Sequence, residues 1–275
     1  MMAPQDFIPQ IAQWVGTLDE TFPGAQVKPY FAHWEVVHLL SLALLGGSSI
    51  LLNLRLMGYG LTDAPPSEVR RGVAPWLHLG VFGILFTGLL IGASNPDRLY
   101  TSEAFTAKML CLAAALVLTY GVSLPTARSN GRLGPFAVAA GLVGLAIWGL
   151  GLAVFGTGKL INPGLWHVVT AAALVGLFIT RGLTRIIYLA GMGALIIVQY
   201  VNTHIIIKPD DYARLDPTNK IYFGVFLAWI VGAVIVQVIT AGRGATGGPA
   251  TRLFAFAALL VWVTTAAAGR WIAFA

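Results

Sequence analysis

The feature that most constrains this chain of 275 residues is a series of long intervals that contain no Asp, Glu, Lys or Arg. A helix that spans the hydrocarbon core of a bilayer needs about 20 consecutive apolar residues. Intervals of this kind occur at residues 36–54, 72–96, 109–127, 133–158, 160–180, 186–207, 221–242 and 253–269. They lack the period-two alternation of barrel strands, so helices must satisfy their backbone groups in lipid. We therefore predict an all-α fold, a polytopic integral membrane helical bundle of about eight transmembrane helices.

Charge is too scarce to cover a water-soluble globule. Only 10% of the residues are charged, whereas a soluble domain carries roughly 25%. The formal net charge is +6, and many of the basic residues lie in short segments between apolar intervals. This placement indicates contact with lipid headgroups of the bilayer and gives no support to nucleic-acid binding.

The pattern divides the chain into residues 1–30 and a transmembrane bundle at 31–275. Within the first part, apolar residues recur at helical spacing at Phe7, Ile8, Ile11, Trp14, Val15 and Leu18. This predicts an amphipathic segment on the outer membrane–water interface. No basic stretch precedes a short apolar core there, which argues against a removable signal peptide. The predicted transmembrane helices occupy about 31–57, 74–94, 105–125, 135–156, 164–181, 185–206, 221–241 and 253–274.

Orientation follows from the basic residues of alternate loops. One set of loops carries Arg70, Arg71, Arg128, Arg132, Arg181, Arg185, Arg243 and Arg252, with Asp63 and Glu68 as its acids. The other set carries Lys28, Arg98, Lys159, Lys208, Arg214 and Lys220, beside the remaining acids. The excess of bases places the first set in the cytoplasm. We expect a bacterial inner membrane protein with both termini in the periplasm.

The first transmembrane helix carries a polar stripe. At 100° per residue, one face of it collects Trp34, Glu35, His38, Ser41, Leu45, Ser49, Leu52 and Asn53. Polar side chains in a membrane are costly unless they are paired or line a cavity. The stripe is therefore expected to point into the bundle.

The predicted topology gathers ionisable groups in the outer leaflet. The candidate cofactor-binding residues are Glu35, His38, Lys108, His167, His204 and Arg270. Imidazole is a common ligand of metals and of haem iron, so His38 and His167 are the candidate metal ligands, for a b-type haem whose propionates Lys108 or Arg270 would neutralise. The same residues could hold copper or a quinone headgroup. Alternatively, the two long cations simply extend to the interface.

Three functions remain open on these residues. The first is a membrane electron-transfer subunit with haem or quinone, working with a periplasmic redox protein or within a larger membrane complex. The second is copper transport or tolerance, and the third is a cofactor-free assembly or scaffold protein. Motifs for nucleotide binding, serine hydrolases and metalloproteases are absent from the sequence. Whether the chain is an enzyme stays open.

A further pattern is made of residues 30–58 with His38, Gly46 and Gly47, then Pro75, Trp76, 87–90, Phe105, Lys108, Trp262 and 269–274. In these segments the chain resembles a family of uncharacterised bacterial four-helix membrane proteins. The chain is also distantly similar to CopD-like copper-resistance membrane proteins, which implies copper handling, although the Met-rich motifs of a copper path are absent. The resemblance implies shared roles for His38, Arg55, Lys108 and Arg270. It also implies that residues from about 135 to 242 add four helices to the shorter family.

Overall fold

The computed structural model describes residues 2–156, 163–240 and 247–274, and every regular element within these ranges is a helix. The predicted all-α fold is therefore confirmed. Two of the basic residues that entered the orientation argument, Lys159 and Arg243, lie outside the described residues.

Seven helical segments of the described residues are long and apolar enough to cross a membrane, which identifies a multi-pass membrane protein. An eighth apolar helix, α10, has 17 residues, at the lower limit of a spanning length of about 17–25 residues. The eight segments correspond in order to the eight predicted intervals. Their elements are α4 (Phe31–Met57), α5 (Pro66–Ser94), α7 (Glu103–Leu118) with η3 (Thr119–Ser123) and α8 (Leu124–Arg128), α9 (Pro135–Gly156), α10 (Pro163–Ile179), α11 (Gly182–Tyr200) with η4 (Val201–Ile206), α12 (Tyr212–Thr240) and α13 (Pro249–Trp271).

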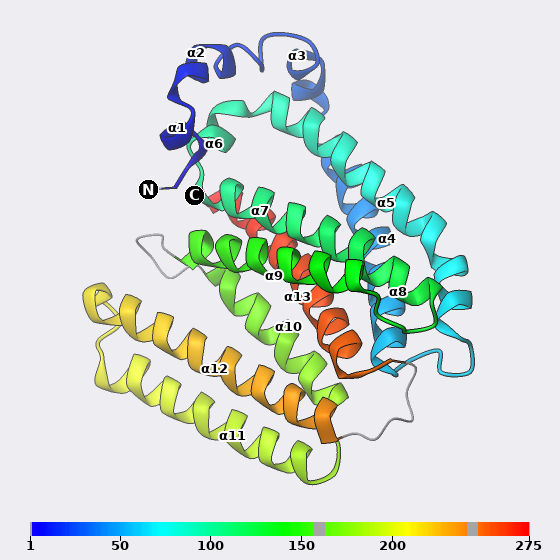
Figure 1. Ribbon diagram of the computed structural model, residues 1–275. Helices are drawn as coiled ribbons and strands as arrows, with labels where there is room; N and C mark the ends of the chain where they lie inside the picture. Colours follow the sequence, from blue (N-terminus) through cyan, green and yellow to red (C-terminus); the bar gives the residue numbers. More distant parts are fainter. Residues whose placement is uncertain (1, 157–162, 241–246, 275) are drawn as a thin grey trace.

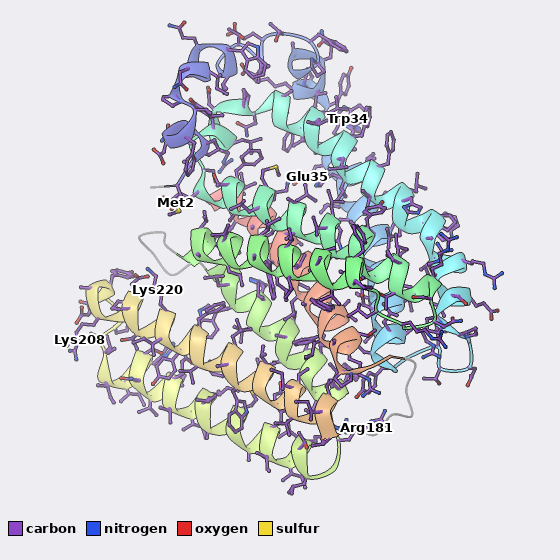
Figure 2. The ribbon with its side chains drawn as sticks, viewed as in Figure 1. Met2, Trp34, Glu35, Arg181, Lys208 and Lys220 are labelled. Carbon is purple, nitrogen blue, oxygen red and sulfur yellow. The ribbon has the colours of Figure 1, made fainter. Side chains whose placement is uncertain are left out.

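Helix α13 lies in the middle of the bundle, where it packs against α4, α7, α9, α10 and α12 (Figure 1). Helices α11 and α12 form an outer pair, and α12 joins it to the centre through contacts with α10 and, to a smaller extent, with α13. The chain termini lie near each other, and Met2, Lys208 and Lys220 point to the same end of the bundle, whereas Arg181 lies at the other end (Figure 2). We call these ends the terminal face and the opposite face.

The N-terminal residues form a string of short helices instead of one amphipathic helix. The elements are α1 (Pro4–Phe7), η1 (Pro9–Ile11), α2 (Ala12–Val15), α3 (Gly24–Val27) and η2 (Lys28–Tyr30). Proline contributes to the division, because Pro9 begins η1 and cannot continue the helix α1 that precedes it. Phe7 and Trp14 are nonetheless exposed, as residues at a membrane interface would be.

This string is attached to the terminal face by hydrogen bonds to distant parts of the chain. The Tyr100 hydroxyl, on α6 (Pro96–Tyr100), donates to the Ile8 carbonyl over 2.7 Å. The Met2 amide donates to the Glu103 carboxylate over 3.1 Å. At the same face, α6 is itself joined to the end of the chain, because the Arg98 guanidinium donates to the Ala273 carbonyl, within η5 (Ile272–Phe274).

Two helices begin well before the intervals that predicted them. Helix α5 starts at Pro66 instead of about residue 74, and α12 starts at Tyr212 instead of about 221. In the early turns of α12, Lys220 pairs with Asp216 at 2.7 Å, four residues apart. A charge-free interval marks only the part of a helix that lies in lipid. It therefore does not reveal the charged turns by which a helix continues into the aqueous phase.

Glycine allows neighbouring helices to approach closely. A Cβ atom at Gly80 of α5 would lie 2.7 Å from the backbone nitrogen of Leu45 on α4. One turn further along, a Cβ at Gly83 would lie 2.2 Å from the Ser41 hydroxyl oxygen. Helices α7 and α9 meet in the same way, with Gly151 against the sulfur of Cys111. Such close packing is a principal cause of helix association in lipid. Transfer of an apolar side chain from lipid to a helix interface yields little free energy, because both surroundings are apolar.

Replacement of Gly80 by alanine should separate α4 from α5. We expect Gly80→Ala to lower the stability of the detergent-solubilised protein by about 1–3 kcal/mol, because the added methyl group meets backbone atoms that cannot rotate away. Gly72→Ala on the same helix is the matched control, since nothing lies within 4 Å of its Cβ position. Thermal unfolding measures both variants, and equal midpoints would contradict the packing argument.

Candidate functional site

The pairing of α4 with α5 brings His38 against Thr87. The imidazole Nδ1 of His38 lies 2.7 Å from the Thr87 hydroxyl oxygen. Thr87 is buried, and His38 is partly buried on the face that meets α5. The next residue, Gly88, brings the α5 backbone close to the ring, because a Cβ there would lie 3.5 Å from His38 Cε1.

Hydrogen-bond accounting assigns the tautomer of His38. The Thr87 hydroxyl has a single hydrogen, and it donates this hydrogen to the Gly83 carbonyl over 2.6 Å. The hydroxyl oxygen is then an acceptor for the imidazole, so Nδ1 carries the hydrogen and donates it. In the neutral ring this leaves a lone pair on Nε2. Metal-ligating histidines commonly donate the other ring N–H to an oxygen in this way.

Lys108 of α7 supplies a positive charge near this imidazole. Its ammonium group is near enough for a Coulomb interaction with His38. Its side chain extends over Gly269 of α13, where a Cβ would lie 3.4 Å from Lys108 Cε and 3.7 Å from Nζ. Lys108 is partly buried, and it forms no ion pair with a described residue. An ammonium group in such a position is costly unless an anion or a dipole approaches it.

The other predicted site residues occupy exposed positions. Glu35 lies on α4, His167 on α10, His204 on η4 and Arg270 near the end of α13. The His167 ring lies 5.7 Å from that of Trp271. The ring of His204 stacks on Tyr200, one turn earlier in the same segment, at 4.6 Å. The structure thus brings together His38 and Lys108, and no group of three or more His, Cys, Asp and Glu side chains within the described ranges could hold a metal ion.

Residues 11–163 match a protein family described as "Family of unknown function (DUF6644)". The chain belongs to this family. No curated protein and no solved structure matches it. The match confirms the resemblance to an uncharacterised family, but it changes the expected extent. It continues through α9, so the helices beyond the matched region begin after residue 163 and not at about 135, and α13 lies outside it.

The family region contains His38, Thr87 and Lys108, whereas His167, His204 and Arg270 lie beyond it. The part of the candidate site that the structure brings together around α4, α5 and α7 is thus the part that falls within the DUF6644 match. Beyond this region, the Lys108 side chain passes close to Gly269 of α13. This helix completes the packing around the family region from outside it.

A buried polar network was not predicted. Ser123 donates to the Asn53 side-chain oxygen over 2.8 Å, and Asn53 donates to the Ser49 carbonyl over 2.9 Å. On the other side, the Trp262 indole donates to the Thr119 hydroxyl over 3.1 Å. Thr119 and Ser123 both belong to η3, a π-helical segment within the third span. The polar stripe of the first span included Ser49 and Asn53. No sequence pattern predicted the π-helical segment η3, which supplies Ser123 as the partner of Asn53.

A second polar group lies at the opposite face. The Tyr59 hydroxyl donates to the Ile179 carbonyl over 2.6 Å, and the Arg181 guanidinium lies 5.1 Å from the centre of the Tyr59 ring. Burial raises the pKa of the Tyr59 phenol, and the positive charge of Arg181 opposes this shift. The phenol therefore stays neutral and keeps its hydrogen bond at neutral pH.

Removal of the Lys108 charge should stabilise the cofactor-free protein. We expect Lys108→Met to raise the free energy of unfolding by about 1–3 kcal/mol, because it replaces an ammonium group within the span by an apolar side chain of similar length. Lys208→Met is the matched control, since Lys208 is exposed. Thermal unfolding in detergent compares the two. An unchanged or lower midpoint for Lys108→Met would show that the side chain only anchors the helix at the interface.

Proposed function

We propose that this protein is a membrane electron-transfer subunit that binds a b-type haem or a quinone at His38. The observation that carries the proposal is the hydrogen bond from His38 Nδ1 to Thr87, which leaves the Nε2 lone pair for a ligand. That lone pair could ligate haem iron or accept a hydrogen bond from a quinol hydroxyl. A bound cofactor of either type would carry the electrons.

Lys108 supports the same proposal through its charge. A haem carries anionic propionates, and the oxygen atoms of a quinone headgroup carry partial negative charge. Either would be stabilised by a nearby ammonium group in a medium of low dielectric constant. The cost of placing Lys108 in the span would then be offset when the cofactor binds. A lysine retained at a cost to stability is expected at a functional site.

The spans and the basic opposite face favour the orientation proposed from the sequence. The face around Arg181 would lie in the cytoplasm, and the terminal face would lie in the periplasm of a bacterial inner membrane. His38 and Lys108 would then lie in the periplasmic half of the bundle. A soluble redox protein could reach the exposed terminal face from that side.

Absorbance of the detergent-purified protein tests the proposal. We expect a Soret band that shifts on reduction with dithionite, or a quinone that organic solvent extracts in stoichiometric amount. His38→Ala should abolish either signal. His33→Ala is the matched control, because His33 lies on the same helix at an exposed position and contacts Tyr30. It should leave the signal unchanged.

The Thr87→Val variant tests whether His38 binds a cofactor or serves only in helix packing. The substitution keeps the shape of the side chain and removes the acceptor that orients the imidazole. We expect cofactor affinity to fall about 10–100-fold, as it does when outer hydrogen-bond partners of ligating histidines are lost. His167→Ala in parallel tests the sequence-based expectation that His167 is a second iron ligand, because its loss would then convert the haem spectrum from low spin to high spin.

Other outcomes would overturn the proposal in distinct ways. Protein that contains neither haem nor quinone, but binds copper and loses copper uptake on His38→Ala, would be a copper transporter. Protein without any of the three, in which His38→Ala changes only the unfolding midpoint, would be an assembly or scaffold protein.

A further inference from the structure

An open cavity of about 540 Å³ lies at the opposite face, away from His38. It is formed where the first turns of α5 meet η3 and α8, and its lining residues are Arg70, Tyr120, Leu124, Pro125, Arg128 and Ser129. Its volume falls within the range of about 300–1,000 Å³ that is usual for ligand pockets. All of the lining residues lie within the family match.

The two arginines of this cavity lack anionic partners among the described residues. Arg70 Nε is buried without a hydrogen-bond partner in the described ranges. Arg128 is exposed, and neither arginine forms an ion pair with a described residue. A buried guanidinium N–H without an acceptor costs free energy, so the group is expected to meet an oxygen ligand.

The π-helical segment η3 shapes the cavity. Such segments shift the register of the following side chains and often occur at functional sites. Here Thr119 and Ser123 point to the core, whereas Tyr120 lines the cavity. The Tyr120 hydroxyl lies 3.0 Å from His78 Nδ1, and the two rings stack at 5.5 Å. The wall thus combines two cations with aromatic and apolar surface from Tyr120, Leu124 and Pro125.

We propose that this cavity binds the phosphate group of an anionic phospholipid from the leaflet at the opposite face. Arg70 and Arg128 would pair with the phosphate oxygens, and Leu124 and Pro125 would contact the start of the acyl chains. Guanidinium groups recognise phosphate through paired N–H donors. Basic pockets between transmembrane helices at a cytoplasmic interface suit such headgroups. A free phosphate ion shares this chemistry but would gain nothing from the apolar wall.

Position in the bilayer favours lipid over a soluble anion. Arg70 lies in the second turn of α5, and Arg128 ends α8, so both lie where spans leave the membrane. The neighbouring acids, Asp63 before α5 and Glu68 in its first turn, are exposed and form no ion pair with these arginines. The charge at this edge is therefore available to a lipid that diffuses laterally to it.

Lipid binding to the full-length protein tests the proposal. Native mass spectrometry and thermal unfolding in a neutral detergent would compare added phosphatidylglycerol, phosphatidylcholine and inorganic phosphate. We expect phosphatidylglycerol to raise the unfolding midpoint and to remain bound in the spectrometer. The variant with both Arg70→Gln and Arg128→Gln should bind it at least tenfold more weakly. Arg71→Gln is the matched control, because Arg71 is exposed, adjacent in sequence and outside the cavity lining.

Each contrary result overturns the assignment. Equal binding of phosphatidylcholine, or equal loss in Arg71→Gln, would show that the cavity does not select an anionic lipid. Protection by inorganic phosphate as strong as that by lipid would make it a site for a soluble anion. Should the double variant fail to fold, Arg128→Gln alone decides, because this exposed residue can change without disturbing the core. Undiminished affinity in that variant would refute the pairing.

Discussion

The close approach of α4 and α5 is the contact on which the candidate site depends. In lipid, helices associate where small residues let their backbones meet, and Gly80 provides this at Leu45. Because α4 and α5 are antiparallel, this one contact also determines which of their residues lie opposite each other nearer the terminal face. Ser41 meets Gly83, and His38 meets Thr87. The acceptor that sets the tautomer of His38 therefore owes its position to a glycine contact about two turns away.

The polar groups of the bundle differ along its length in whether their hydrogen-bonding capacity is used within the protein. At the terminal half, His38 and Lys108 keep a lone pair and a charge available near each other. In the other half, Asn53, Ser123 and Thr119 bond to neighbours and leave little for a ligand. Beyond this network, the arginines at the edge of α5 and α8 again lack partners among the described residues. Hydrogen-bonded polar groups thus lie between the two regions for which we propose ligands.

Much of the architecture could be predicted because lipid imposes a simple rule on sequence. The bounds predicted for the first span, 31–57, agree with α4, and those predicted for 135–156 agree with α9. Helix ends were missed where charged turns extend beyond the membrane, as at Tyr212 of α12. Of the candidate site, His38 and Lys108 were predicted and lie near each other, whereas Thr87 entered only within a resemblance and its hydrogen bond was not foreseen. The electron-transfer role stays a proposal.

The sequence by itself determined that this chain crosses a membrane several times as helices, because a backbone in lipid has no other way to satisfy its hydrogen bonds. It also determined which polar residues would be costly there, His38, Asn53 and Lys108 among them. Only the tertiary structure decided which of these residues meet. Partners such as Thr87 and Ser123 come from other helices, and helix rotation and the π segment at Thr119–Ser123 set their directions. Both depend on the shapes of facing surfaces, which a one-dimensional pattern of polarity does not contain.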